Sequence, residues 1–184
     1  MNIENKLLVL PEGEFQTEVS IFEESDRKEL LSIYTEWRNL AKSAISLGGR
    51  GTNLPEILSE GAFCLEMNNV RITESIKRAN SSFDAYNLST QKRIQIKAAS
   101  VIPDLTSFGP KSVWDELYFV DFSKLDGTFD IYLIPSEYIY NYPVNKTQIM
   151  RDQQVQGKRP RFSIYTGIIE SMNLSPVRTG DLNS

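Results

Sequence analysis

Three polar residues in the middle of the chain have the types and spacing that phosphodiester hydrolysis requires. Asp84 is followed, a hairpin's length later, by Gln95 and Lys97 in the stretch RIQIKAAS. Polar and apolar residues alternate in this stretch, so Gln95 and Lys97 project from the same face of a strand. If the segment SSFDAYNL is its antiparallel neighbour, Asp84 reaches that face. The pattern then predicts a carboxylate, an amide oxygen and an ammonium group at one point.

This set of groups suits metal-dependent hydrolysis of a phosphate diester. Magnesium prefers hard oxygen ligands, which Asp84, Gln95 and the backbone carbonyl of Ile96 can supply. A bound metal neutralises charge on the phosphate and lowers the pKa of a bound water. Lys97 can stabilise developing negative charge, or orient or deprotonate the attacking water. The competing interpretation is structural: Asp84 is a strand-edge acid, and Gln95 and Lys97 belong to a solvated strand face.

The composition excludes several other catalytic chemistries. The 184-residue chain has no histidine and one cysteine, Cys64. Catalysis by Ser-His-Asp or Cys-His groups is therefore excluded, as are zinc sites with histidine ligands. We expect Cys64 to be a packing residue of a helix. The single cysteine fits a cytoplasmic protein. We find no signal peptide, no apolar run long enough for a membrane span and no sign of an organic cofactor.

Basic residues cluster locally although the net charge is −4. Residues 146–161 carry five cations against one acid, and residues 91–111 carry four against one. Such patches allow an acidic chain to bind a phosphate backbone. The residues that we expect to contact DNA are Arg50, Asn53, Gln154, Gln156, Lys158, Arg159 and Arg161. The alternatives are a solvated loop for the C-terminal group and a helix cap for Asn53.

The periodicity of the chain predicts an α/β or α+β fold with a central mixed sheet flanked by helices. We expect one domain, residues 1–184, with a helical N-terminal segment (1–80), a β-rich catalytic core (81–135) and a DNA-contacting C-terminal segment (136–184). The expected helices lie at 29–48, capped near Ser25, at 53–67, capped by Asn53, and after Pro135. The expected strands lie at 15–22, 81–88, 93–100, 116–122, 128–135 and 161–169, with a basic loop at 153–161.

The segment from Asp84 to Lys97 resembles the motif of the PD-(D/E)XK nucleases, in particular small type II restriction endonucleases. In that motif an aspartate precedes, by a hairpin's length, an acidic residue, any residue and a lysine. Asp84 and Lys97 match its two ends. Gln95 replaces the usual acid, as in some members of the family, and residues 81–83 replace the proline before the aspartate. The dipeptide Pro103-Asp104 has no such continuation, so we expect a turn there.

The resemblance implies magnesium as cofactor and double-stranded DNA as substrate. Such enzymes often take an additional carboxylate from a preceding helix, for which Glu56 is our candidate, with Glu60 one turn later on the same face. Glu56 as a partner of the Asn53 cap is the structural alternative. A likeness across residues 48–60 and 81–100 is to enzymes that cut short GC-rich palindromes, which implies a homodimer. A non-catalytic nucleic-acid-binding module, favoured by Gln95, and a protein-interaction domain remain alternatives.

Overall fold

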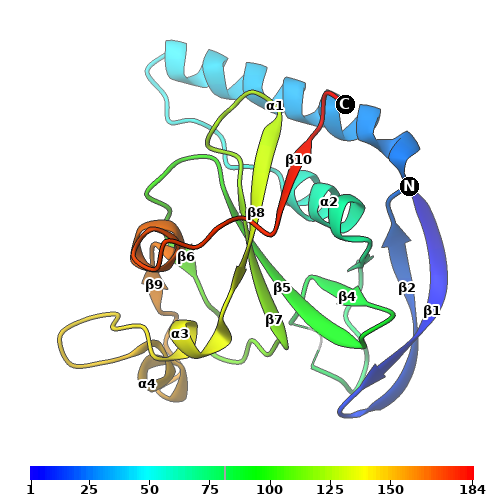
Figure 1. The fold of residues 1–184 in the computed structure, drawn as a ribbon, viewed down its shortest axis with the longest axis vertical. Helices are drawn as coiled ribbons and strands as arrows, with labels where there is room; N and C mark the ends of the chain where they lie inside the picture. Colours follow the sequence, from blue (N-terminus) through cyan, green and yellow to red (C-terminus); the bar gives the residue numbers. More distant parts are fainter. Residues whose placement is uncertain (81) are drawn as a thin grey trace.

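The computed structural model describes residues 1–80 and 82–184, and its centre is an eight-stranded mixed sheet (Figure 1). The strand order is β1-β2-β3-β4-β5-β7-β8-β10, and every neighbouring pair is antiparallel except β5 and β7. The strands are β1 (Asn2–Leu10), β2 (Gly13–Ile21), β3 (Val70–Ile72), β4 (Ala85–Asn87), β5 (Lys92–Ala99), β7 (Glu116–Asp121), β8 (Thr128–Ile134) and β10 (Arg178–Asp181). The central mixed sheet flanked by helices is therefore confirmed.

Helices and a small second sheet surround this central sheet. The second sheet pairs β6 (Thr106–Ser107) with β9 (Arg161–Phe162). The helices are the 3-10 turn Glu24–Asp26, α1 (Arg27–Ser46), α2 (Glu56–Met67), α3 (Ser136–Tyr140), α4 (Met150–Val155) and the π-helix Tyr165–Glu170. None of the described helices combines the length and the apolar composition needed to span a bilayer.

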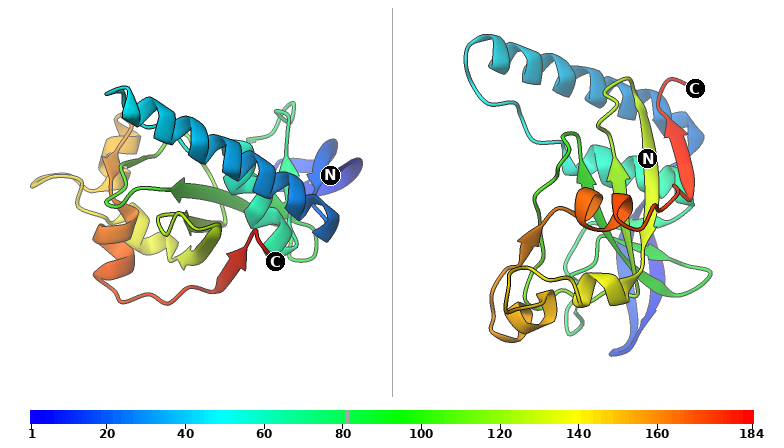
Figure 2. Two further views of the ribbon diagram at one scale, coloured as in Figure 1. Left: turned by 90° about the horizontal axis from the view of Figure 1, so that it is seen from above. Right: turned by 60° about the vertical axis from the view of Figure 1, so that its left-hand side comes forward.

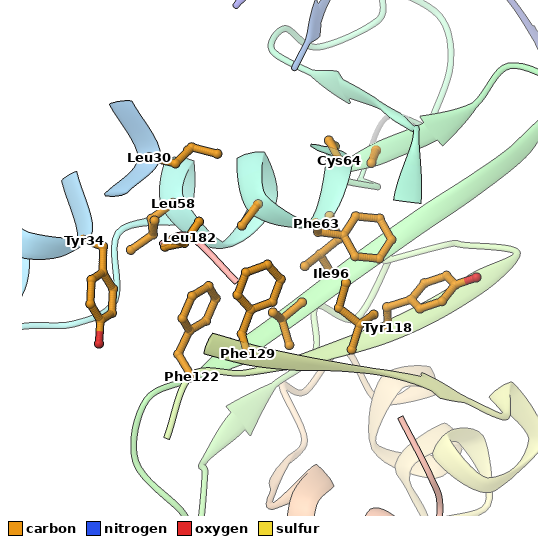
Figure 3. Close-up of a cluster of buried hydrophobic side chains, with 14 of the residues drawn as sticks. Leu30, Tyr34, Leu58, Phe63, Cys64, Ile96, Tyr118, Phe122, Phe129 and Leu182 are labelled. Atoms are coloured by element: carbon orange, nitrogen blue, oxygen red, sulfur yellow. The ribbon is translucent and has the colours of Figure 1, made fainter. Parts of the chain in front are cut away.

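Helices α1 and α2 cover one face of the sheet through a continuous apolar core (Figure 3). Leu30 of α1 and Phe63 of α2 pack there with Ile96 of β5. Phe63 is fully buried, so its truncation to alanine is expected to cost about 3–5 kcal/mol of stability. Cys64 is buried in the same cluster, and burial raises the pKa of its thiol. The packing role expected for Cys64 is confirmed.

The C-terminal third of the chain covers the opposite face. Side chains of β7 and β8, such as Phe119 and Ile134, pack there against Phe162, Ile164 and Ile168. Figure 2 shows these C-terminal elements on the side of the sheet away from α1. Because β9 pairs with β6, which follows β5 in the chain, the basic C-terminal segment lies close to the end of β5.

Several strand and helix predictions need correction. Residues 1–80 hold β1, β2 and β3 besides the two expected helices, and β1 was not predicted. Residues 161–169 are not a strand: only Arg161–Phe162 pair, and a π-helix follows. The last strand is β10, in a segment for which no strand was predicted. Some of the expected basic loop is helical, because Met150–Val155 form α4.

The predicted helix caps are also wrong. Helix α1 begins at Arg27 behind a short 3-10 turn that contains Ser25. Helix α2 begins at Glu56, and the residue in the cap position is Pro55, so Asn53 lies outside the helix. Pro55 carries no N–H and has extended backbone angles, which place the helix start after it. The predicted end of α1 is confirmed, since Gly48 has the positive φ of +78° typical of that position.

Candidate active site

The site forms where the ladder between β4 and β5 stops. The two strands pair from Asn87 to Ala85, and the backbone N–H of Asp84 makes one more bond, to the Ile94 carbonyl (2.9 Å). Beyond it the Asp84 side chain takes the place of a continuing strand. Its Oδ2 accepts the backbone N–H of Ile96 (2.7 Å) and the Nε2 amide of Gln95. The hairpin thus brings the first two residues of the predicted set into contact.

Two oxygen atoms of this pair remain open. Both hydrogen bonds of the Asp84 carboxylate go to Oδ2. Within residues 1–80 and 82–184, neither Asp84 Oδ1 nor Gln95 Oε1 accepts a hydrogen bond, and neither atom is fully buried. A carboxylate oxygen and an amide oxygen are hard donors of the kind that magnesium prefers. The donor chemistry of the pair therefore fits a small divalent cation.

The backbone of β5 directs a third oxygen to the same edge. The carbonyls of Arg93 and Ala99 accept bonds at the β7 edge (2.9 and 2.8 Å), whereas the Ile94 carbonyl accepts the bond from Asp84 at the β4 edge. The Ile96 N–H also points to the β4 edge, where it meets Asp84. N–H and C=O of one strand residue point to the same edge. The Ile96 carbonyl therefore faces the edge that β4 leaves uncovered.

Burial dominates the electrostatics of Asp84. Desolvation raises the pKa of this carboxyl, and the charge of Glu56 acts in the same direction. The Ile96 N–H and the positive charge of Lys97 oppose the rise. Lys97 is half-buried and lies two residues beyond Gln95 on the same strand. The positive charge of Lys97 therefore acts on the Asp84 carboxylate.

Two carboxylates of α2 lie near the site, and both form ion pairs with Arg71. This arginine of β3 binds Glu60 through Nε (2.6 Å) and Glu56 through Nη2 (2.8 Å). Glu60 is buried, and desolvation and the nearby Asp84 raise its pKa to about 8 despite Arg71. The Glu56 side chain, by contrast, is 74% exposed. Sequence reasoning missed Arg71, because β3 has only three residues and shows no periodicity that would place its side chain.

No cluster of three acidic, histidine or cysteine side chains close enough to hold a metal exists among the described residues. The group that does converge is one carboxylate, one amide and one backbone carbonyl. Magnesium in proteins keeps several waters and needs only one or two carboxylates besides substrate phosphates. The set at Asp84 fits that requirement. The Ser81 position before the motif lies outside the described residues.

The expected DNA-contacting residues fall into two groups around the end of β5. Asn53 lines an open cleft of about 430 Å³ between residues 51–54 and 98–106, and Arg50 is exposed just before that loop. Lys158, Arg159 and Arg161 are exposed on the segment that enters β9. Gln154 donates to the Gly109 carbonyl (2.9 Å) and Gln156 accepts a bond from Gln148 (3.0 Å), so both carry local contacts.

Comparison with known proteins assigns the chain to a family. Residues 22–171 match the model of a family described as Bsp6I restriction endonuclease. The chain belongs to the Bsp6I restriction endonuclease family. It is 35% identical over 160 residues to the type II restriction enzyme Bsp6I of Bacillus sp. (strain RFL6). The aligned region covers 85% of this chain and 88% of the relative. No solved structure matches the chain.

The Bsp6I family match includes the whole candidate site. It begins just after β2 and ends before β10, so the β1–β2 hairpin and the last strand lie outside it. Helix α2, the β4–β5 hairpin and the basic segment before β9 all lie inside it. The predicted relationship to type II restriction endonucleases is thereby confirmed.

Proposed function

We propose that this protein is a type II restriction endonuclease that hydrolyses both strands of DNA at a short, GC-rich palindromic site in a magnesium-dependent reaction. The observation that carries the proposal is the contact between Asp84, Gln95 and the Ile96 backbone, with Lys97 beside them. A homodimer would supply two such sites to a symmetric target. The cytoplasm is the compartment in which we expect it to act.

The residues that would hold magnesium are Asp84, Gln95 and Ile96, through Oδ1, Oε1 and the backbone carbonyl. When bound, the ion supplies positive charge at the scissile phosphate and acidifies the attacking water. The two hydrogen bonds to Oδ2 hold the Asp84 carboxylate in one orientation. Its Oδ1 therefore already faces the proposed metal position before any ligand binds. Such preorganisation lowers the cost of assembling the site.

Lys97 has the role of a charge-stabilising and water-orienting group. Its ammonium lies on the strand face next to Asp84, where negative charge develops on the phosphate as water attacks in line. A cation held in a partly dry site stabilises that charge more than it would in water. Lys97 can also orient or deprotonate the attacking water.

Helix α2 supplies the additional carboxylate. Glu56 was the sequence candidate, and Glu60, one turn later, is buried, bound by Arg71 and near enough to Asp84 for their charges to interact, so either glutamate can fill this role. Glu56 remains close enough for its charge to act on Asp84. The shared partner Arg71 restrains both side chains.

DNA contact falls to the two exposed groups that flank the site. Lys158, Arg159 and Arg161 would bind phosphates or guanine edges from one side, and Arg50 and Asn53 from the other. Gln154 and Gln156 would exchange their present bonds for bases or support the basic residues. Phosphate contacts of this kind predict an affinity that falls steeply with salt concentration.

The test is digestion of mixed-sequence DNA by the purified protein, with magnesium and with EDTA, followed by sequencing of the fragment ends. Discrete magnesium-dependent fragments with one shared end sequence are expected. The Lys97→Ala variant should bind DNA with unchanged affinity and lose cleavage by several orders of magnitude. Full activity of that variant would defeat the assignment of Lys97.

A non-catalytic DNA-binding module is the second candidate, and Gln95 favours it. One carboxylate fewer than usual weakens metal capture. A salt-sensitive mobility shift with intact DNA in the presence of magnesium would support this binder. Failure to bind DNA at any salt concentration would contradict both candidates.

A further inference from the structure

The ammonium group of Lys97 lies over an aromatic ring. Its Nζ is 5.8 Å from the centroid of the Phe108 ring. The face of such a ring carries negative potential, so it attracts a cation at this range. None of the ion pairs between described residues involves Lys97. The ring therefore attracts the ammonium group and leaves its positive charge in place. A paired carboxylate would neutralise that charge.

The position of Phe108 is itself fixed on several sides. Its side chain is buried, and it stacks on Phe162 with ring centroids 5.3 Å apart and contacts Trp114 at 5.8 Å. Phe162 in turn stacks on Tyr142 at 4.0 Å. The Phe108 backbone N–H donates to the Pro160 carbonyl (3.1 Å). The ring thus belongs to a rigid aromatic column next to the basic segment.

We propose that Phe108 is the positioning residue of Lys97. The lysine side chain has four rotatable methylene groups and adopts many conformations unless a partner selects one. The Phe108 face selects the conformation that keeps the ammonium near Asp84, and the aromatic column keeps that face in place. The proposal rests on the proposed function, because it assigns Phe108 a role only through the catalytic use of Lys97.

Stepwise fluorination of the ring tests the proposal without changing the shape of the core. Phe108 is replaced by phenylalanines that carry one, two or three fluorine atoms, which progressively weaken the negative potential of the face. We expect kcat to fall at each step, by about tenfold over the series. The KM for DNA and the thermal midpoint of unfolding should stay nearly constant, because neither the fold nor the DNA contacts change.

The same series at Phe129 is the matched control. Phe129 is fully buried in the core beneath α1 and α2 and stacks on Phe122, away from Lys97. Fluorination there should leave kcat unchanged. A constant kcat across the Phe108 series, or an equal fall in the Phe129 series, would overturn the positioning role.

Lys97→Ala separates failure of this inference from failure of the proposed function. Loss of cleavage in Lys97→Ala together with a flat Phe108 series leaves the nuclease assignment intact and rejects only the positioning role. Wild-type cleavage by Lys97→Ala removes the catalytic role of the lysine, and the role of Phe108 falls with it.

Discussion

Two largely buried aspartates of this chain have opposite surroundings. Asp104 follows a proline, as the first aspartate of the nuclease motif usually does, yet all its bonding capacity is used. Its Oδ1 accepts bonds from Ser163 Oγ (2.6 Å) and Tyr165 N (3.0 Å), and its Oδ2 from Thr106 Oγ1 (2.6 Å) and Ile164 N (3.0 Å). Asp84 lacks the proline, and its Oδ1 is open.

We therefore use the bonding state of each carboxylate, and not the residue before it, to separate the structural Asp104 from Asp84, which we propose binds metal. Asp104 joins the loop after β5 to the start of the π-helix, and no lone pair is left for a ligand. Burial raises the pKa of Asp84, and two donors on one oxygen do not offset this. A carboxyl group whose pKa is shifted in this way by burial is a candidate functional residue.

The largest expected effect is that of Asp84→Asn on catalysis. The amide keeps an acceptor for the Ile96 N–H, so the fold should be retained. It removes the negative charge that would hold the metal, and cleavage should fall on the order of a thousandfold or more. Initial rates on a plasmid substrate, together with thermal unfolding, measure both quantities. A variant that cuts at the wild-type rate would place the reaction elsewhere in the molecule.

The same substitution at Asp104 should act on stability instead. An asparagine NH2 in place of either oxygen would face a backbone N–H, of Ile164 or of Tyr165, inside the protein. The free energy of unfolding should fall by about 3 kcal/mol. Urea unfolding measures this loss. Cleavage by the folded fraction should decline far less than in Asp84→Asn, and the reverse ranking would invalidate the comparison.

The raised pKa of Glu60, which lies close to Asp84, predicts how the stability of the protein depends on pH. Its folded-state pKa of about 8 lies above the ordinary value of 4.5. The folded protein therefore keeps a proton that the unfolded chain has released. Stability falls as pH rises from about 4.5 to about 8 and changes no further through this group above that window.

The Glu60→Gln variant does not titrate and should escape this loss. Relative to it, the wild type should lose stability progressively across the window, by at most about 5 kcal/mol, measured by urea unfolding in EDTA. The exposed Glu18 of β2 provides the matched control, since Glu18→Gln should follow the pH dependence of the wild type. Parallel curves for wild type and Glu60→Gln would mean that Glu60 is charged in the folded protein throughout.

The hairpin that carries the site was predictable, because local signals determine it. Alternation in β5, a hairpin's length after Asp84, predicted the pairing that brings Asp84 to Gln95. The strands expected at 116–122 and 128–135 likewise left only a short turn between β7 and β8, where Gly127 has a φ of +94°. Both elements depend on residues that are close in sequence, so tertiary context had little to override.

The elements that were missed depend on distant residues. The apolar stretch at 161–169 has the composition of a strand, but Asp104 accepts the Ile164 and Tyr165 N–H groups, and Ile164 and Ile168 pack on one helical face. Asp104 lies about sixty positions earlier, at a spacing that no local pattern reveals. The contact of Arg71 with Glu60 has the same cause, because β3 is too short to show which way its side chains point.

The smallest expected effect concerns Gln95, which decides whether the open oxygens beside Asp84 form a metal site. Gln95→Glu places a second carboxylate against Asp84. Without metal the two like charges repel, so stability in EDTA should fall by about 1 kcal/mol. With magnesium the added charge strengthens binding. The concentration that gives half-maximal cleavage should then fall by about fivefold, and the ion should restore the lost stability.

Thermal unfolding with and without magnesium, beside a cleavage titration, measures both halves of this prediction. Gln16→Glu makes the same change of charge at an exposed position of β2 and should show neither effect. The two results have to agree, because one ion between Asp84 and residue 95 causes both. If magnesium does not raise the stability of the Gln95→Glu variant, the side-chain oxygens of Asp84 and residue 95 are not ligands of the ion. The contrast with Asp104 would then be one of exposure and not of function.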